Sequence, residues 1–278
     1  MLATFLEMFS YPFMVRAIIV GILVSLCSAL LGTSLVLKRY SMIGDGLSHM
    51  GFAALAVAYA ANLAPLSVAI PVCIVSAFLL LRMNENSKIK GDAATAIMMS
   101  GALAIGVITV SMAGGMNTDI SNYMFGSILA MTDSDVKISV VLSIVVIALF
   151  FLFYPRLFSI TFDENYAKAI GVKSGLYNML LALLTAVTVV LGMRMMGTLL
   201  ISSLIVFPSL SAMRVCKHFS AVTIASVILS VFCFLVGIYV SYVYATPTGA
   251  SIVMANIIVF LIMILVEQFR SRFGKIKE

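Results

Sequence analysis

The feature that most constrains the fold is a series of apolar stretches that fills nearly the whole chain. A helix of about 20 apolar residues spans the hydrocarbon core of a bilayer. Of the 278 residues, 63% are hydrophobic and 10% are charged, whereas soluble domains average about 45–50% apolar and about 25% charged residues. We therefore expect an all-α, polytopic transmembrane bundle in a single domain, 1–278, with no sizeable soluble part.

Basic residues cluster between these stretches. Lysine and arginine concentrate in cytoplasmic connections, so four connections and the C-terminal tail are expected inside. The net charge of +6 is then explained by the basic residues of these cytoplasmic connections, and no nucleic-acid partner is expected. We predict eight or nine spans, and nine would place the N-terminus outside. The nine-span version has helices at 13–37, 42–61, 63–81, 93–113, 137–154, 175–193, 197–213, 219–243 and 248–267.

Two segments are too short to span the membrane. Residues 1–12 are expected to form an interfacial helix, and residues 123–130 an interfacial or re-entrant helix. Three carboxylates lie near the second of these segments, on one predicted external loop. They could attract cations electrostatically or simply be solvated; they are Asp119, Asp133 and Asp135.

The predicted span 42–61 carries two ionisable residues, Asp45 and His49. Their spacing of four places them about 6 Å apart along one helix face. Ionisable groups within a span are costly and usually pair or handle ions. Carboxylate and imidazole are suitable ligands for zinc and manganese. Two ligands from one chain do not complete a structural site of four, which suits an ion that must leave. A second copy of the chain could complete the site; alternatively, the pair only holds helices together.

The segment 161–171 predicts a short amphipathic helix in the longest cytoplasmic connection. Thr161 and Glu164 have capping-box spacing, and Gly171 is placed to end the helix. An apolar face repeats every four residues, at Phe162, Tyr166 and Ile170. Such a helix could dock into a soluble partner or rest on lipid.

The predicted span 197–213 contains a proline and several hydroxyl groups. Pro208 removes a backbone hydrogen bond to the carbonyl of Leu204, which nearby serine side chains can satisfy. The candidate pathway or hinge residues are Pro208, Ser202 and Ser203. The span is therefore either a kinked pathway helix or an ordinary helix with serine-mediated packing.

Two enzyme motifs are absent from the sequence. It contains no G-x-x-x-x-G-K-[ST] phosphate-binding loop, so the chain is not expected to hydrolyse ATP. It also contains no H-E-x-x-H motif, the commonest metalloprotease signature.

At these residues the chain resembles a known family: the membrane permease subunit of bacterial ABC-3 type importers for zinc, manganese and chelated iron. The resemblance covers nearly the whole chain. Its more specific parts are Leu37-Lys-Arg-Tyr-Ser-Met-Ile-Gly-Asp-Gly-Leu-Ser-His49 and the pattern Phe162-Asp-x-x-x-Ala-x-x-x-Gly171. Weaker matches are Asn122 to Ala130, Gly197 to Pro208 and Pro247-Thr-Gly249.

The resemblance implies a homodimer in the bacterial plasma membrane, with two cytoplasmic ATP-binding subunits and an extracytoplasmic metal-binding protein. It also implies that Asp45 and His49 are the translocation ligands. The segment 161–171 becomes the coupling helix, with Phe162, Asp163, Ala167 and Gly171 contacting the ATPase. No cofactor is bound permanently. The transported ion is expected to be Zn²⁺, with Mn²⁺ or iron next.

The sequence is also compatible with two other functions. A cation- or proton-coupled secondary transporter could use Asp45 and His49 as its relay, without an ATPase partner. Such transporters usually show inverted repeats, and none is detected here. An intramembrane metalloenzyme would need a further ligand or base within the spans, and the sequence offers no convincing one.

Overall fold

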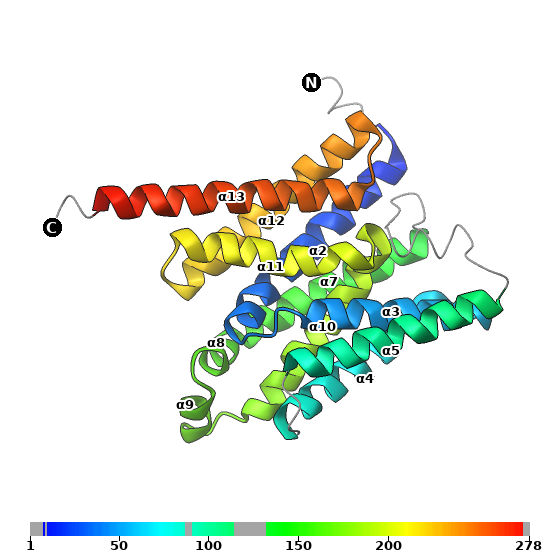
Figure 1. Cartoon of the computed structure of the whole chain (residues 1–278), viewed down its shortest axis with the longest axis horizontal. Helices are drawn as coiled ribbons and strands as arrows, with labels where there is room; N and C mark the ends of the chain where they lie inside the picture. The colour runs from blue at the N-terminus through cyan, green and yellow to red at the C-terminus, as the bar shows by residue number, and fades with distance from the viewer. Residues whose placement is uncertain (1–7, 9, 87–90, 114–131, 275–278) are drawn as a thin grey trace.

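A computed structural model describes residues 8, 10–86, 91–113 and 132–274. Within these ranges the chain is helical and contains no β-strand. Figure 1 shows the arrangement. The helices are α2 (Pro12–Leu37), α3 (Ile43–Ala60), α4 (Pro65–Asn86), α5 (Gly91–Met112), α7 (Asp133–Leu152), α8 (Tyr154–Phe162), α9 (Glu164–Ala169), α10 (Ser174–Met196), α11 (Thr198–Val215), α12 (Phe219–Tyr244) and α13 (Thr248–Gly274).

Seven of the described helices are long and apolar enough to cross a membrane, namely α2, α4, α5, α7, α10, α12 and α13. The expected all-α, multi-pass architecture is thereby confirmed. Helices α3 and α11 occupy the other two predicted spans. Helix α3 carries Asp45, His49 and several glycines, while the apolar part of α11 is shorter, Leu200–Val215. The total of eight or nine spans therefore stays a prediction, and most of residues 1–12 and all of 123–130 lie outside the described part of the chain.

Charged side chains mark the two ends of the bundle. At one end, Lys38 after α2 contacts Glu164 of α9, and Arg214 of α11 pairs with Glu267 of α13 at 3.1 Å. At the other end, Arg16 near the start of α2 pairs with Asp133 of α7 at 2.5 Å. By the positive-inside rule, the end that holds Lys38 and Arg214 faces the cytoplasm.

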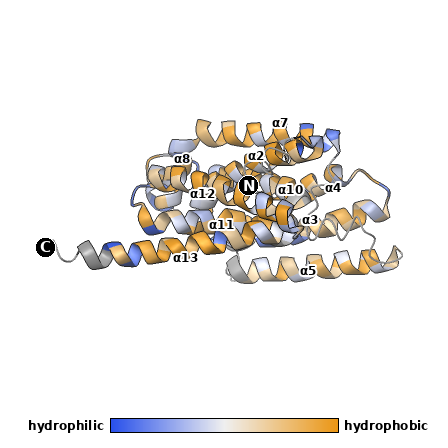
Figure 2. Ribbon diagram, turned by 90° about the horizontal axis from the view of Figure 1, so that it is seen from above, coloured by the Kyte–Doolittle hydropathy of each residue, from blue (hydrophilic) through white to orange (hydrophobic). Residues whose placement is uncertain are grey.

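The helices form layers of different burial. Within their most apolar windows, 67% of α2 and 78% of α10 is buried, against 28% of α5, α7 and α13. Figure 2 shows α7 on one face of the bundle and α5 and α13 on the opposite face, with apolar residues along their lengths. Helices α2 and α10 therefore form the centre, while the outer helices present apolar side chains to lipid. Helix α3 packs against α4, α5, α10 and α11.

Candidate metal-translocation site

Helix α3 approaches its neighbours closely because glycines line its first turns. A Cβ at Gly44 would lie 3.0 Å from Cδ1 of Ile205 on α11, and a Cβ at Gly46 would lie 2.8 Å from Cγ2 of Thr95 on α5. Small residues allow such close backbone approach in membranes. The glycines thus allow the start of α3 to be buried among other helices.

Asp45 and His49 face each other on this buried helix. The distance from His49 Nε2 to Asp45 Oδ1 is 3.9 Å, with the side chains 10% and 25% exposed. This is too long for a hydrogen bond. Zinc bonds to histidine nitrogen and carboxylate oxygen are about 2.0–2.2 Å long, so one ion could contact both atoms. His49 Nδ1 is buried and has no hydrogen-bond partner among the described residues. The imidazole is thus held by packing rather than by strong hydrogen bonds.

Helix α11 contributes one hydroxyl group to this pair. Ser202 Oγ donates a hydrogen bond of 3.2 Å to Asp45 Oδ1. The next serine behaves differently, because Ser203 Oγ donates to the carbonyl of Leu200 in its own helix at 2.7 Å. The structure therefore brings Ser202 to the predicted ligands and turns the hydroxyl of Ser203 back onto α11.

Pro208 lies inside α11 at a close contact with α2. A Cβ at Gly32 of α2 would overlap the carbonyl oxygen of Ile205, one turn before the proline. Ser209 Oγ donates to this same carbonyl at 3.3 Å. This bond goes to the carbonyl of Ile205 and not to that of Leu204, the acceptor that Pro208 leaves without its backbone donor, so the predicted compensation by serine stays a prediction.

The other described carboxylates of the predicted external loop have protein partners of their own. Asp133 pairs with Arg16, and Asp135 accepts from Thr132 N at 2.9 Å in the capping box of α7. Asp119 lies outside the described residues. The Thr-x-x-Asp spacing is itself a sequence signal for this cap. The described part of the chain holds no group of three or more metal-ligating side chains from His, Cys, Asp and Glu.

The predicted capping of the cytoplasmic segment 161–171 is wrong in detail. Thr161 lies in the last turn of α8, where its hydroxyl donates to the carbonyl of Leu157 at 2.6 Å. Asp163 is the residue in extended conformation before α9, and its carboxylate accepts from Tyr166 N at 2.9 Å. An aspartate can cap a helix as well as a threonine, and here the Thr161 hydroxyl is occupied within α8. The segment is consequently two helices joined at Asp163 rather than one.

The predicted glycine at the end of this segment is confirmed. Gly171 follows α9 and has φ +84°, a conformation that favours glycine.

Aromatic rings cover the cytoplasmic surface beside α9. The ring centroids of Phe158 and Phe162 are 4.9 Å apart, and those of Phe158 and Phe219 are 5.2 Å apart. Phe162 nevertheless remains 60% exposed, as do large parts of Tyr166 and Ile170. The predicted apolar face at 162, 166 and 170 is therefore present and uncovered in the single chain, while Ala167 on the opposite side of α9 is buried.

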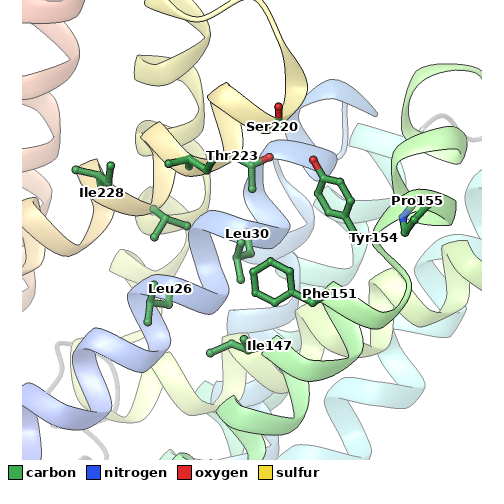
Figure 3. A pocket seen from close by; sticks show the side chains of 11 residues that line it. Leu26, Leu30, Ile147, Phe151, Tyr154, Pro155, Ser220, Thr223 and Ile228 are labelled. Atoms are coloured by element: carbon green, nitrogen blue, oxygen red, sulfur yellow. The ribbon is translucent and has the colours of Figure 1, made fainter.

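A separate groove between α2, α7 and α12 is shown in Figure 3. Its volume is about 590 Å³, and its lining is mainly apolar, with the hydroxyls of Tyr154 and Ser220 toward one end. Neither Asp45 nor His49 lines it. None of its lining residues belongs to α3, so the groove is not part of the candidate metal site.

Comparison with known proteins identifies the family. A family model described as "ABC 3 transport family" matches residues 10–267. The chain belongs to this family. It is 32% identical over 274 residues to the "Probable iron transport system membrane protein" of Haemophilus influenzae, covering 99% of this chain and 96% of that one. It is 29% identical over 252 residues to the manganese import system permease protein ScaB of Streptococcus gordonii, covering 91% and 90%.

A solved structure has the same architecture. The chain superposes on PsaBC from Streptococcus pneumoniae, determined in complex with a Fab, with a TM-score of 0.87, 28% identity and full coverage of both chains. The ABC 3 transport family member described here is thus a multi-pass permease subunit of the bacterial plasma membrane. It is not an enzyme, because ATP hydrolysis resides in a separate subunit of such systems.

Proposed function

We propose that this permease forms the membrane pathway of an ATP-driven importer of divalent transition-metal ions. The observation that carries the proposal is the Asp45–His49 pair on a buried helix of an ABC 3 family member. Relatives named for manganese, iron and zinc transport support the substrate class. We place zinc first, with manganese and then iron next, because the imidazole and carboxylate bind zinc more strongly than manganese.

Asp45 and His49 act as transient ligands in this proposal. Two ligands hold an ion less tightly than a closed site of four, so the ion can leave toward the cytoplasm. A homodimer would place a second Asp45–His49 pair across the pathway and could complete the coordination during passage. Ser202 orients the Asp45 carboxylate, and Pro208 allows α11 to bend where it passes the site. Ser203 lies beside Ser202 on α11, and its hydroxyl bonds within that helix.

The segment formed by α8 and α9 is proposed to couple ATP hydrolysis to transport. Exposed Phe162 and the cap Asp163 would contact a cytoplasmic ATP-binding subunit. Buried Ala167 lets α9 pack against the bundle, and Gly171 turns the chain into α10. Two such ATP-binding subunits would serve the homodimer. An extracytoplasmic metal-binding protein would deliver the ion to the opposite end.

Transport then proceeds in three steps. The binding protein docks outside and releases a divalent ion into the pathway. Asp45 and His49 coordinate the ion while the cytoplasmic side is closed. ATP binding and hydrolysis in the partner subunits move the α8–α9 segments, and access changes to the cytoplasm.

The test is ion uptake into proteoliposomes that contain this chain, its ATP-binding subunit and its binding protein. Uptake of Zn²⁺ and Mn²⁺ is compared with and without ATP. We expect ATP-dependent uptake, faster for zinc. Faster uptake of manganese would overturn the choice of metal alone. Uptake that needs a proton gradient and no ATP would instead support the secondary-transporter alternative, which nothing in the family comparison favours.

A further inference from the structure

Lys38 lies where four helices meet at the cytoplasmic end of the bundle. Its ammonium group donates to the carbonyl of Ile160 on α8 at 3.0 Å, to Glu164 Oε2 on α9 at 3.3 Å and to Asn178 Oδ1 on α10 at 2.7 Å. A lysine ammonium has three N–H donors, so each has an acceptor here. Lys38 itself follows the last residue of α2. One side chain thus connects α2 with three other helices.

This side chain is buried despite its charge. Only 7% of the Lys38 side chain is exposed, and Asn178 is also buried. Asn178 Nδ2 completes the cluster by donating to Glu164 Oε2 at 3.2 Å. Separating a buried charge from its partners is strongly unfavourable, because the charge is left without compensation. Helix α9 and the end of α2 are therefore expected to move together.

The turn that follows Lys38 is well defined and leads directly to the candidate metal site. Arg39 has φ +60°, and Tyr40 N donates to the carbonyl of Leu35 at 2.8 Å, which is the hydrogen-bond pattern of a Schellman motif. Ile43, the first residue of α3, donates to the carbonyl of Tyr40 at 3.0 Å. Asp45 lies in the first turn of α3. The path from Lys38 to the first ligand thus consists of two short hydrogen-bonded turns and the start of α3.

We propose that Lys38 is a positioning residue that transmits movement of the α9 segment to the α2–α3 turn and so to Asp45 and His49. The inference rests on the proposed function, because it assigns a route between the ATPase-contacting segment and the ion ligands. Within α9, Glu164 supplies the acceptor for this link, whereas its pairing with Lys168 at 3.0 Å stays inside the same helix. The link is a mechanical connection through a packed polar cluster, and Lys38 does not contact the ion.

The experiment compares Lys38→Met with wild type in proteoliposomes that contain the full chain, the ATP-binding subunit and the binding protein. Zinc uptake and ATP hydrolysis are measured in the same vesicles. We expect hydrolysis to continue while the number of ions imported per ATP falls roughly tenfold, because ATP is then hydrolysed without the matching movement of the ion ligands. Lys38→Arg, which keeps the charge and the donors, should restore part of this ratio.

Arg214→Gln is the matched control. It removes another inter-helix ion pair at the same end of the bundle, between α11 and α13, without touching α9. Its ion-to-ATP ratio should equal that of wild type. If Lys38→Met does not fold, Glu164→Ala, which leaves α9 no side-chain acceptor for Lys38 at this position, removes the same link from the partly exposed partner and decides the question by the same ratio.

Two results would count against the inference in different ways. The inference is overturned if Lys38→Met imports as many ions per ATP as wild type. This includes the case in which uptake and hydrolysis fall in parallel, because a merely structural role lowers both together. A wild-type complex without ATP-dependent uptake would overturn the proposed function as well.

Discussion

Ser202 on α11 donates a 3.2 Å hydrogen bond to Oδ1 of Asp45 on α3, the same oxygen that faces His49 Nε2 at 3.9 Å. These residues are 157 positions apart in the chain. The bond orients the carboxylate toward the imidazole and leaves its other oxygen without this constraint. An ion between Asp45 and His49 would therefore meet a ligand whose orientation α11 controls.

Replacing Ser202 tests this relationship. Ser202→Ala should raise the ion concentration that gives half-maximal uptake by about two- to tenfold, as expected for loss of a hydrogen bond worth roughly 0.5–1.5 kcal/mol. Ser203→Ala is the control, because the Ser203 hydroxyl donates to the Leu200 carbonyl within α11 and not to Asp45. Equal effects of the two substitutions in ATP-driven uptake assays would contradict a specific role for Ser202.

The ligands themselves are tested by Asp45→Ala and His49→Ala. Each should reduce ATP-dependent metal uptake to background, because one remaining ligand cannot guide the ion through the span. Both variants should still insert into the membrane, since shortening a polar side chain lowers the cost of burial. Membrane fractionation checks insertion and radioactive-metal uptake checks transport. Normal transport by both variants would show that the site is elsewhere.

Close packing of α2 on α11 predicts a stability difference between two glycines. A Cβ at Gly32 would overlap the Ile205 carbonyl oxygen, whereas a Cβ at Gly101 of α5 meets nothing within 4 Å. Gly32→Ala should therefore destabilise the protein by about 1–3 kcal/mol. Gly101→Ala should be neutral or stabilise it by up to about 1 kcal/mol. Thermal unfolding in detergent measures both, and similar midpoints would argue against the close α2–α11 contact.

The exposed ring of Phe162 predicts a contact with the ATP-binding subunit. Phe162→Asp should weaken assembly with that subunit roughly thirtyfold, as for an interface residue worth about 2 kcal/mol. Phe162→Leu keeps an apolar side chain and should assemble nearly normally. Co-purification and titration of the ATP-binding subunit provide the measurement. Tight assembly of the aspartate variant would mean that the coupling contact does not involve this face.

The Glu164 carboxylate should make the stability of the folded protein depend on pH. Burial alone raises the pKa of this carboxyl, but hydrogen bonds from Lys168, Asn178 and Lys38 and the Lys38 charge lower it from 4.5 to about 2. The folded state thus keeps the carboxylate ionised at pH values where the unfolded chain binds a proton. The contribution to stability is complete above about pH 5 and is lost as the pH falls toward about 2.

The corresponding measurement compares wild type with Glu164→Gln in detergent. The wild type should unfold at a higher temperature above about pH 5, and the difference should shrink as the pH is lowered, because protonation removes the charge that Gln lacks. A difference that is constant across this pH range would mean that the Glu164 charge does not stabilise the cluster.

The sequence by itself determined the features that depend on neighbouring residues. Runs of apolar residues identified the helices of a membrane bundle, and the i,i+4 spacing placed Asp45 beside His49 on one helix face. Gly171 was identifiable as a terminus because a positive φ favours glycine. The same local reasoning chose the wrong cap for α9, since Thr161 and Asp163 are both good capping residues and only the end of α8 distinguishes them.

Only the tertiary structure decided the contacts between distant parts of the chain. That Ser202 rather than Ser203 reaches Asp45 depends on the rotation of α11 against α3, which their close packing at Gly44 sets. That Lys38 is a buried junction rather than a solvated cytoplasmic charge depends on α8, α9 and α10 meeting the end of α2. Such contacts join residues more than 100 positions apart. They follow from how whole helices pack, which hydrophobic periodicity within one segment does not specify.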